Sequence, residues 1–147
     1  MPNDTVRAGK VRYIGVSDTP AWKVAEANTT ARFRGWSQFI GLQIEYSPLE
    51  RSVEAELVPM AQELGLGIMP WSPLKGGALS GKYTHASAGS HKTDRGEFMT
   101  ALNERTYTLV DKLEKIAKAH DSTVVRIALA WVRTRPGVTS TSSGRGA

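Results

Sequence analysis

The chain has 147 residues, of which 40% are hydrophobic and 22% are charged, and its formal net charge is +5 at pH 7. This length and composition fit one folded domain, exclude a disordered chain, and leave no apolar run near the ~18 residues that a membrane helix needs. The absence of cysteine excludes disulfides, thiol catalysis and cysteine-ligated metal sites, and is compatible with a cytoplasmic protein.

The basic charge allows an anionic partner, but its distribution argues against nucleic acid. The 19 Lys and Arg residues are scattered among 14 Asp and Glu residues, whereas nucleic-acid surfaces cluster basic side chains with interleaved aromatic ones. We expect no nucleic acid and no membrane partner, and a small phosphate-bearing ligand fits the pattern better. The histidines form no helical metal-binding pair, so no metal site is predicted.

The first half of the chain predicts strands that alternate with helices. Residues 11–16 are short, apolar and β-branched, which predicts a strand. Capping side chains at residues 17–19 and Pro20 predict a helix over residues 20–34, which Gly35 ends. Residues 39–46 predict a second strand. Ser52 could cap a helix that ends at Gly65, and Pro59 inside it means that this helix bends or begins late.

The second half continues this alternation. Residues 67–71 predict a third strand, and residues 72–98 form a long loop rich in small and polar residues, which is typical of functional segments. Amphipathic periodicity predicts helices over residues 107–120 and, after a Ser122 cap, through residue 133. Residues 138–141 predict a fourth strand, and the tail 142–147 has no packing capacity.

This alternation predicts an α/β fold in which the strands are parallel. Four such units do not close a barrel, so the pattern corresponds to part of a larger architecture.

Ligands of parallel α/β folds bind at the carboxyl ends of the strands. The residues at or just after the predicted strand ends are polar or aromatic: Ser17, Asp18, Gln43, Tyr46, Trp71 and Ser72. Such a set can hydrogen-bond an amide and stack on a flat heteroaromatic ring, but it contains no convincing general base. Alternative roles remain open, because Ser17 and Asp18 could cap a helix and Trp71 could be a core residue. Glu45 and Glu50 are interpreted as solvated charges.

Four motifs of the chain resemble the aldo-keto reductases, most closely a bacterial branch with a Trp-Ser-Pro-Leu cofactor loop. These motifs are GKVRYIGVSD, LQIEYSPLER, MPWSPLKGGALSGKY and ALAWVRTRPGVTS, and the resemblance covers roughly residues 8–141. It implies a (β/α)8 barrel that binds NADP(H) and reduces aldehydes and ketones by hydride transfer. We therefore expect residues 1–147 to form a single truncated domain, the second half of such a barrel, with 142–147 as a non-family tail.

The resemblance also assigns cofactor-binding roles to individual residues. Ser17, Asp18 and Gln43 match positions that bind the nicotinamide carboxamide, and Trp71 matches the ring that stacks on the nicotinamide. Two further groups match the loop along the pyrophosphate and the basic residues near the phosphates or adenosine; they are Ser72, Pro73, Leu74, Gly76 and Gly77, and Lys82 and Arg95.

Departures from the family pattern bear on activity. The family's catalytic Asp, Tyr, Lys and His belong to the first half of the barrel, so no catalytic residue is assigned here, and weak or absent activity is expected. If activity is found, Tyr46 is the first substitute proton donor to test. Asp18 replaces an asparagine, and the tail 142–147 replaces residues that hold the 2′-phosphate, so weak NADPH binding is expected.

The open half-barrel would expose strand edges, which favours self-association as a homodimer or larger species. Two alternatives are a non-catalytic self-associating module and a promiscuous activity unrelated to carbonyl reduction.

Overall fold

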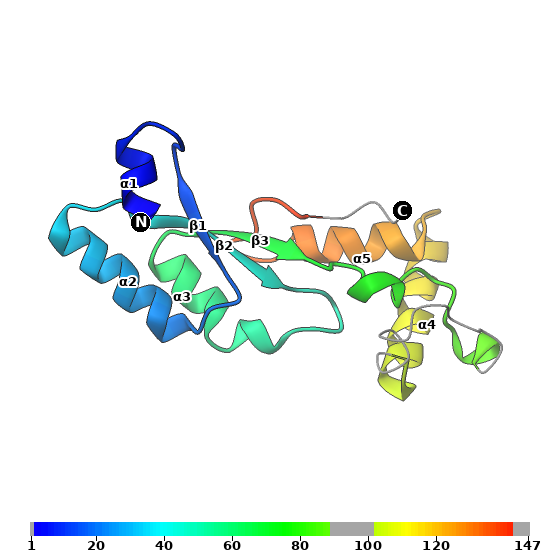
Figure 1. Cartoon of the computed structure of the whole chain (residues 1–147). Helices are drawn as coiled ribbons and strands as arrows, with labels where there is room; N and C mark the ends of the chain where they lie inside the picture. Colours follow the sequence, from blue (N-terminus) through cyan, green and yellow to red (C-terminus); the bar gives the residue numbers. More distant parts are fainter. Residues whose placement is uncertain (1, 89–101, 143–147) are drawn as a thin grey trace.

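The computed structural model describes residues 2–88 and 102–142, so Arg95 and the tail residues 143–147 lie outside the described ranges. Figure 1 shows a central group of strands with α2 and α3 along one side of it, while α4 and α5 lie beyond the end of β3. This arrangement confirms the expected α/β architecture.

The sheet contains three parallel strands in the order β1-β2-β3. They are β1 (Ile14–Ser17), β2 (Phe39–Glu45) and β3 (Gly67–Trp71). Each agrees with a predicted strand to within a few residues. Their register pairs Ser17 with Gln43 and Gln43 with Met69, so equivalent positions form rows across the sheet.

The predicted fourth strand at residues 138–141 is wrong as a full strand. This segment lies along β3 but forms only an isolated parallel bridge between Ile68 and Val138. Pro70 explains the interruption, because it has no N–H to donate at the next step of the ladder. Its carbonyl still accepts from the Ser142 amide at 2.8 Å, so the segment stays beside the sheet.

The helices of the first half follow the predicted order, with one addition. A short helix, α1 (Pro2–Arg7), precedes the sheet and was not predicted. The long helix α2 (Ala21–Arg34) ends at Gly35, whose φ of 63° is the left-handed conformation that suits glycine. No side chain caps the start of α2, so the capping role considered for Ser17 and Asp18 is not observed.

The region around Pro59 forms two short helices instead of one long one. A 3₁₀ turn, η1 (Ser52–Glu54), comes first, and α3 (Leu57–Glu63) begins three residues later. Pro59 is the third residue of α3, where a missing N–H costs no intrahelical hydrogen bond. The late start considered from the sequence is therefore the observed solution.

The last two helices have side-chain caps that hydrogen-bond the first turn. Asn103 caps α4 (Glu104–Ala119) by accepting from the Thr106 amide, and this cap starts the helix three residues earlier than predicted. Thr123, instead of the predicted Ser122, caps α5 (Val124–Arg133) by accepting from the Arg126 amide. Residues 72–88 include two 3₁₀ turns, η2 (Lys75–Gly77) and η3 (His85–Ser87).

Two apolar clusters hold these elements together. The first lies between the sheet and helices α2 and α3 and includes Val24, Leu42, Ile44 and Ile68. The second joins α4, α5 and the loop after β3, and its buried residues are Leu79, Val110, Leu113, Val124 and Ala128. The loop after β3 is therefore anchored by its own packing at Leu79.

The opposite face of the sheet, called here the inner face, carries a row of glycines. Gly15, Gly41 and Gly67 form one row across the three strands. The row has no side chains of its own, although Met69 lies against Gly41 and Thr139 against Gly67. A hollow of about 550 Å³ lies over this row, bordered by Tyr13, Ile40 and other residues. Among the described residues, no helix is long and apolar enough to cross a membrane.

Asn28 supplies a buried polar link between α2 and β2. Its side-chain amide donates to the Phe39 carbonyl at 3.0 Å, and its side-chain oxygen accepts from the Phe39 amide at 2.9 Å. Asn28 is only 3% exposed, so the pair satisfies backbone groups that the neighbouring strand does not reach.

We expect Asn28→Ala to lower the free energy of unfolding by ~1–3 kcal/mol, because it leaves the amide and carbonyl of Phe39 without their hydrogen-bond partner. Urea denaturation measures the change. The exposed Thr30→Ala on the same helix is the matched control, with an expected change within ~0.5 kcal/mol. Equal effects of the two variants would contradict this role for Asn28.

Candidate functional site

Three of the predicted site residues lie on one face of the sheet, near its carboxyl edge. Side chains alternate between the two faces of a strand. Ser17 and Gln43 are paired in one row with Met69, and Glu45 and Trp71 are paired in the next row. All therefore belong to the inner face, opposite the helices. The structure brings together the three strand-end residues that the sequence singled out on this face.

Trp71 is held across the sheet by a hydrogen bond. Its indole Nε1 donates to Oδ1 of Asp18 at 3.2 Å. Because β2 separates β1 from β3, the Trp71 side chain must cross β2 to reach Asp18. The ring is half-buried and outside both apolar clusters. The core role considered for Trp71 is therefore not observed.

Asp18 is itself fixed by several contacts. Its Oδ2 accepts from the Ser17 hydroxyl at 3.0 Å, and its backbone amide donates to the Gln43 carbonyl at 3.2 Å. Asp18 has a φ of 43° and Ser72, just after β3, a φ of 50°. Such positive values are uncommon outside glycine and tend to occur at functional sites.

Gln43 provides unused hydrogen-bonding groups beside this arrangement. Its side chain is half-buried and makes no hydrogen bond to any residue within 2–88 or 102–142. A free amide next to an anchored indole can donate to and accept from a ligand.

The loop after β3 satisfies its own backbone. The Gly76 amide donates to the Ser72 hydroxyl at 3.0 Å, and the Gly77 amide donates to the Leu74 carbonyl, also at 3.0 Å. Pro73 is buried, and Leu74 packs against the second cluster. The amides of Gly76 and Gly77 are therefore already used, and phosphate binding by them remains a prediction that would need the loop to rearrange.

Lys82 is predicted to lie near the phosphates of the cofactor, and its surroundings fit this role. It is exposed, and its ammonium group forms no ion pair with any residue in the described ranges. Its charge is therefore available to an anion. Arg95, the other predicted basic residue, is outside the described part of the chain.

Lys75 is a structural residue of this loop that the sequence reasoning missed. Its ammonium nitrogen lies 2.7 Å from Glu45 and 3.4 Å from Glu50, so the interpretation of these two glutamates as solvated charges is wrong. Burial alone would lower the pKa of Lys75, but the hydrogen bond and charge of Glu45 outweigh it and raise that pKa. The pair ties the loop after β3 to the end of β2.

Tyr46 is not a proton donor at the inner face. It follows β2 with the parity of Leu42 and Ile44, and it is 1% exposed. Its hydroxyl donates to Glu54 at 2.7 Å. Burial, followed by this hydrogen bond, raises the pKa of Tyr46 far above its ordinary value. The sequence could have excluded Tyr46 as a proton donor. Leu42 and Ile44, four and two residues before it, are apolar, and alternation along the strand places Tyr46 on their side, toward the core.

The neighbourhood of Tyr46 also ties α5 to the sheet. The Tyr46 ring meets the Trp131 ring edge-on, with centroids 5.7 Å apart. The guanidinium groups of Arg51 and Arg135 lie 5.3 Å and 4.6 Å from the Trp131 ring centroid. Arg51 also pairs with Glu54 through both carboxylate oxygens. These contacts are structural, because they lie on the side of the sheet away from Trp71.

His85 joins η3 to α4 through two carboxylates. Its ring nitrogens lie 2.8 Å from Glu104 and 2.5 Å from Asp111. The hydrogen bond with Glu104, and then that with Asp111, raises the pKa of His85. The hydrogen bond with His85 in turn lowers the pKa of Asp111. Within the described ranges, no group of three or more His, Cys, Asp or Glu residues could hold a metal.

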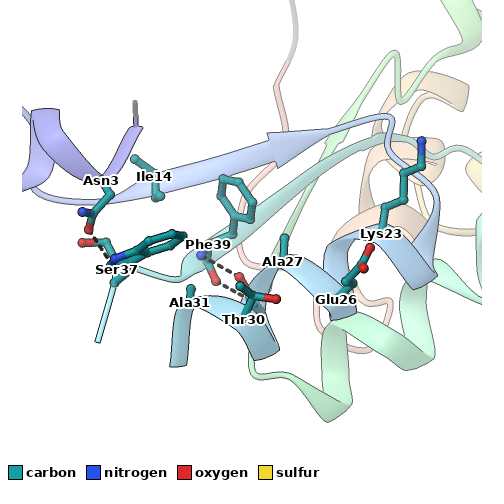
Figure 2. A pocket seen from close by; sticks show the side chains of 11 residues that line it. Asn3, Ile14, Lys23, Glu26, Ala27, Thr30, Ala31, Ser37 and Phe39 are labelled. Carbon is teal, nitrogen blue, oxygen red and sulfur yellow. Dashed lines mark hydrogen bonds between the residues drawn. The ribbon is translucent and has the colours of Figure 1, made fainter. Parts of the chain in front are cut away.

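A separate hollow of about 330 Å³ lies between α1, β1 and α2 (Figure 2). Ile14, Phe39, Ala27 and Ala31 give it apolar walls, and Figure 2 shows Asn3 beside Ser37 at one end. The Asn3 side chain accepts from the Ser37 amide at 3.1 Å, so this polar pair is already engaged. Ile14 and Phe39 begin their strands, so the hollow is at the end of the sheet opposite Trp71.

Comparison with known proteins identifies the family. The model of the aldo/keto reductase family matches residues 3–144, and the chain belongs to this family. It is 37% identical over 135 residues to the uncharacterized oxidoreductase YrpG of Bacillus subtilis strain 168, an alignment that covers 92% of this chain and 40% of that protein.

Two fungal relatives agree with this assignment. The chain is 31% identical over 137 residues to the versiconal hemiacetal acetate reductase of Aspergillus parasiticus, covering 91% of this chain and 40% of that protein. It is 30% identical over 135 residues to an aldo-keto reductase of Fusarium vanettenii, covering 90% and 36% respectively. The chain thus spans about two fifths of the length of these relatives.

The His85 contacts predict a pH window for stability. Because the pKa of His85 is raised above its ordinary 6.5, its contribution is present at lower pH and is lost as pH rises through the raised value. Because the pKa of Asp111 is lowered, its contribution is lost as pH falls through that lowered value. NMR titration of the His85 ring should therefore give a pKa above 6.5.

Glu104→Gln should reduce the His85 pKa toward its ordinary value, since it removes one of the two charged partners. Glu114→Gln is the matched control, because Glu114 is on the same helix and pairs with Lys118 instead. A wild-type His85 that titrates at or below its ordinary pKa would contradict the two-carboxylate geometry.

Proposed function

We propose that this chain forms the cofactor-binding half of an NADPH-dependent reductase that acts on aldehydes or ketones. The observation that carries the proposal is the set of Trp71, Gln43 and Ser17 on the inner face at the carboxyl ends of three parallel strands. When bound, NADPH would supply the hydride that reduces the carbonyl carbon.

The residues present fit the nicotinamide end of such a cofactor. Trp71 offers a flat ring that is already anchored by Asp18, and flat heteroaromatic rings stack favourably on such rings. Gln43 has an unused amide for the carboxamide group, and the exposed Lys82 can meet a phosphate. The fit of the glycine loop is poorer, since the amides of Gly76 and Gly77 already bond within the loop.

Catalysis by this chain alone should be slow. A positioned acid that protonates the carbonyl oxygen typically contributes ~10²–10⁴-fold. Tyr46, the tyrosine next to β2, is buried on the other face and donates to Glu54. We therefore infer that Tyr46 does not supply this proton and that reduction of a small carbonyl substrate by this chain is slow.

Calorimetric titration with NADPH tests the binding proposal. We expect a dissociation constant on the order of 100 μM or weaker, because Lys82 is the unpaired Lys or Arg residue that the described loop after β3, residues 72–88, offers to a phosphate. Trp71→Ala should weaken binding by roughly three- to tenfold through lost stacking, whereas Trp71→Phe keeps a flat ring and should retain most of the affinity.

Trp22→Ala is the matched control, since Trp22 is an exposed tryptophan of α2 on the helix side of the sheet. An equal NADPH affinity of Trp71→Ala and the wild type would contradict the stacking role. No detectable NADPH binding at millimolar concentration would refute the proposed function. Oxidation of NADPH by 4-nitrobenzaldehyde, followed in parallel, should run at least ~100-fold below rates usual for enzymes.

We also propose that the chain self-associates through the inner face. Tyr13 and Ile40, which border the hollow over the glycine row, are 72% and 50% exposed. A register shift between β1 and β2 leaves Ile40 without a paired residue. Exposed apolar side chains beside this hollow favour contact with a second surface.

Light scattering over a concentration series should show a dimer or larger species in the wild type. Ile40→Lys should shift the population toward monomer, because burial of the new charge is unfavourable. The control is Phe33→Lys, which changes an equally apolar but 85% exposed residue of α2. A wild type that stays monomeric at all concentrations would contradict self-association.

A further inference from the structure

Asp18 places a carboxylate beside the ring that is proposed to stack on the nicotinamide. Its Oδ1 is 3.2 Å from Nε1 of Trp71, and its Oδ2 is 3.0 Å from the Ser17 hydroxyl. Both partners are neutral donors, so they orient the carboxylate without cancelling its charge. No Lys, Arg or His within the described ranges forms an ion pair with Asp18.

Hydrogen bonds hold the Asp18 carboxylate in place. The Asp18 amide donates to the Gln43 carbonyl of β2, and both side-chain oxygens accept hydrogen bonds. A ring stacked on the Trp71 indole would therefore lie within a few ångströms of the carboxylate. At such a separation, the interaction with a unit positive charge remains substantial even near solvent.

The two redox forms of the nicotinamide differ in that charge. The oxidised ring is cationic and the reduced ring is neutral, whereas the phosphates, riboses and adenine are the same in both forms. Any contact with the rest of the cofactor therefore cancels when the affinities of the two forms are compared. The comparison isolates what lies next to the ring.

We propose that Asp18 makes this site select the oxidised cofactor, NADP⁺, over NADPH. The inference rests on the proposed cofactor-binding function and adds a specificity-determining residue to it. The expected preference from the carboxylate is roughly three- to tenfold, given an exposed site and partial screening.

This preference has a consequence for hydride transfer. By thermodynamic linkage, tighter binding of the oxidised form lowers the reduction potential of the bound couple. A tenfold preference corresponds to ~30 mV for a two-electron couple. Bound NADPH would therefore be a stronger hydride donor than free NADPH, which favours reduction of carbonyl compounds.

The test measures the dissociation constants of NADP⁺ and NADPH by calorimetry for matched variants. Asp18→Asn keeps an oxygen that can accept from Trp71 Nε1 but removes the charge, so it separates electrostatics from positioning. We expect the ratio of the NADPH to the NADP⁺ dissociation constant to fall by roughly three- to tenfold in Asp18→Asn. The same ratio in the wild type should fall as salt is raised, since salt screens an exposed charge.

Asp121→Asn is the control, because Asp121 is also an exposed aspartate with positive φ, but it follows α4. Its ratio should match that of the wild type. If both cofactor forms bind and Asp18→Asn leaves the ratio unchanged, the inference is overturned while the proposed function stands. If neither form binds at millimolar concentration, the proposed function fails and the inference fails with it.

Discussion

The alternation of side chains along three parallel strands in register is the constraint on which the rest of the structure depends. It sends Leu42, Ile44 and Ile68 toward α2 and α3, where they form the first cluster. The same alternation sends Gln43 and Trp71 to the inner face. A shift of one residue would exchange these two sets and would place polar groups in the core. The core and the candidate site are therefore fixed by one register.

The loops above the carboxyl edge are positioned by contacts that do not involve a ligand. Lys75 links the loop after β3 to Glu45 at the end of β2, and the Tyr46 and Trp131 rings link β2 to α5. The loop after β3 also satisfies the amides of Gly76 and Gly77 internally. The candidate site is consequently organised more completely around Trp71 than in the loop after β3.

Local signals in the sequence were sufficient for most of the fold. Short β-branched runs and glycine stops predicted the three strands and α2, and the strand-end positions of Ser17, Gln43 and Trp71 followed from them. The alternation of side chains could also have placed Tyr46 in the core, since Tyr46 lies on the same side of the chain as Leu42 and Ile44. The late start of α3 was one of two solutions that Pro59 allowed.

The remaining features depend on partners that are distant in sequence. Asn28 bonds to Phe39 eleven residues away, and Lys75 reaches Glu45 across thirty residues, so neither contact has a local pattern. The prediction of a full fourth strand was wrong because Pro70, on the neighbouring strand, cannot donate a hydrogen bond. The bond between Trp71 and Asp18 spans 53 residues and needed the strand order to be known.

The central claim is that the Trp71 indole, fixed by Asp18, forms one wall of a cofactor site. The chain has four tryptophans, so its indole N–H groups give four resolvable NMR signals. Addition of NADPH should shift the Trp71 signal, because a stacked ring changes its magnetic environment, and should leave the signals of Trp22 and Trp36 in place. A Trp71 signal that stays unchanged at saturating NADPH, or equal shifts of all four signals, would contradict the claim.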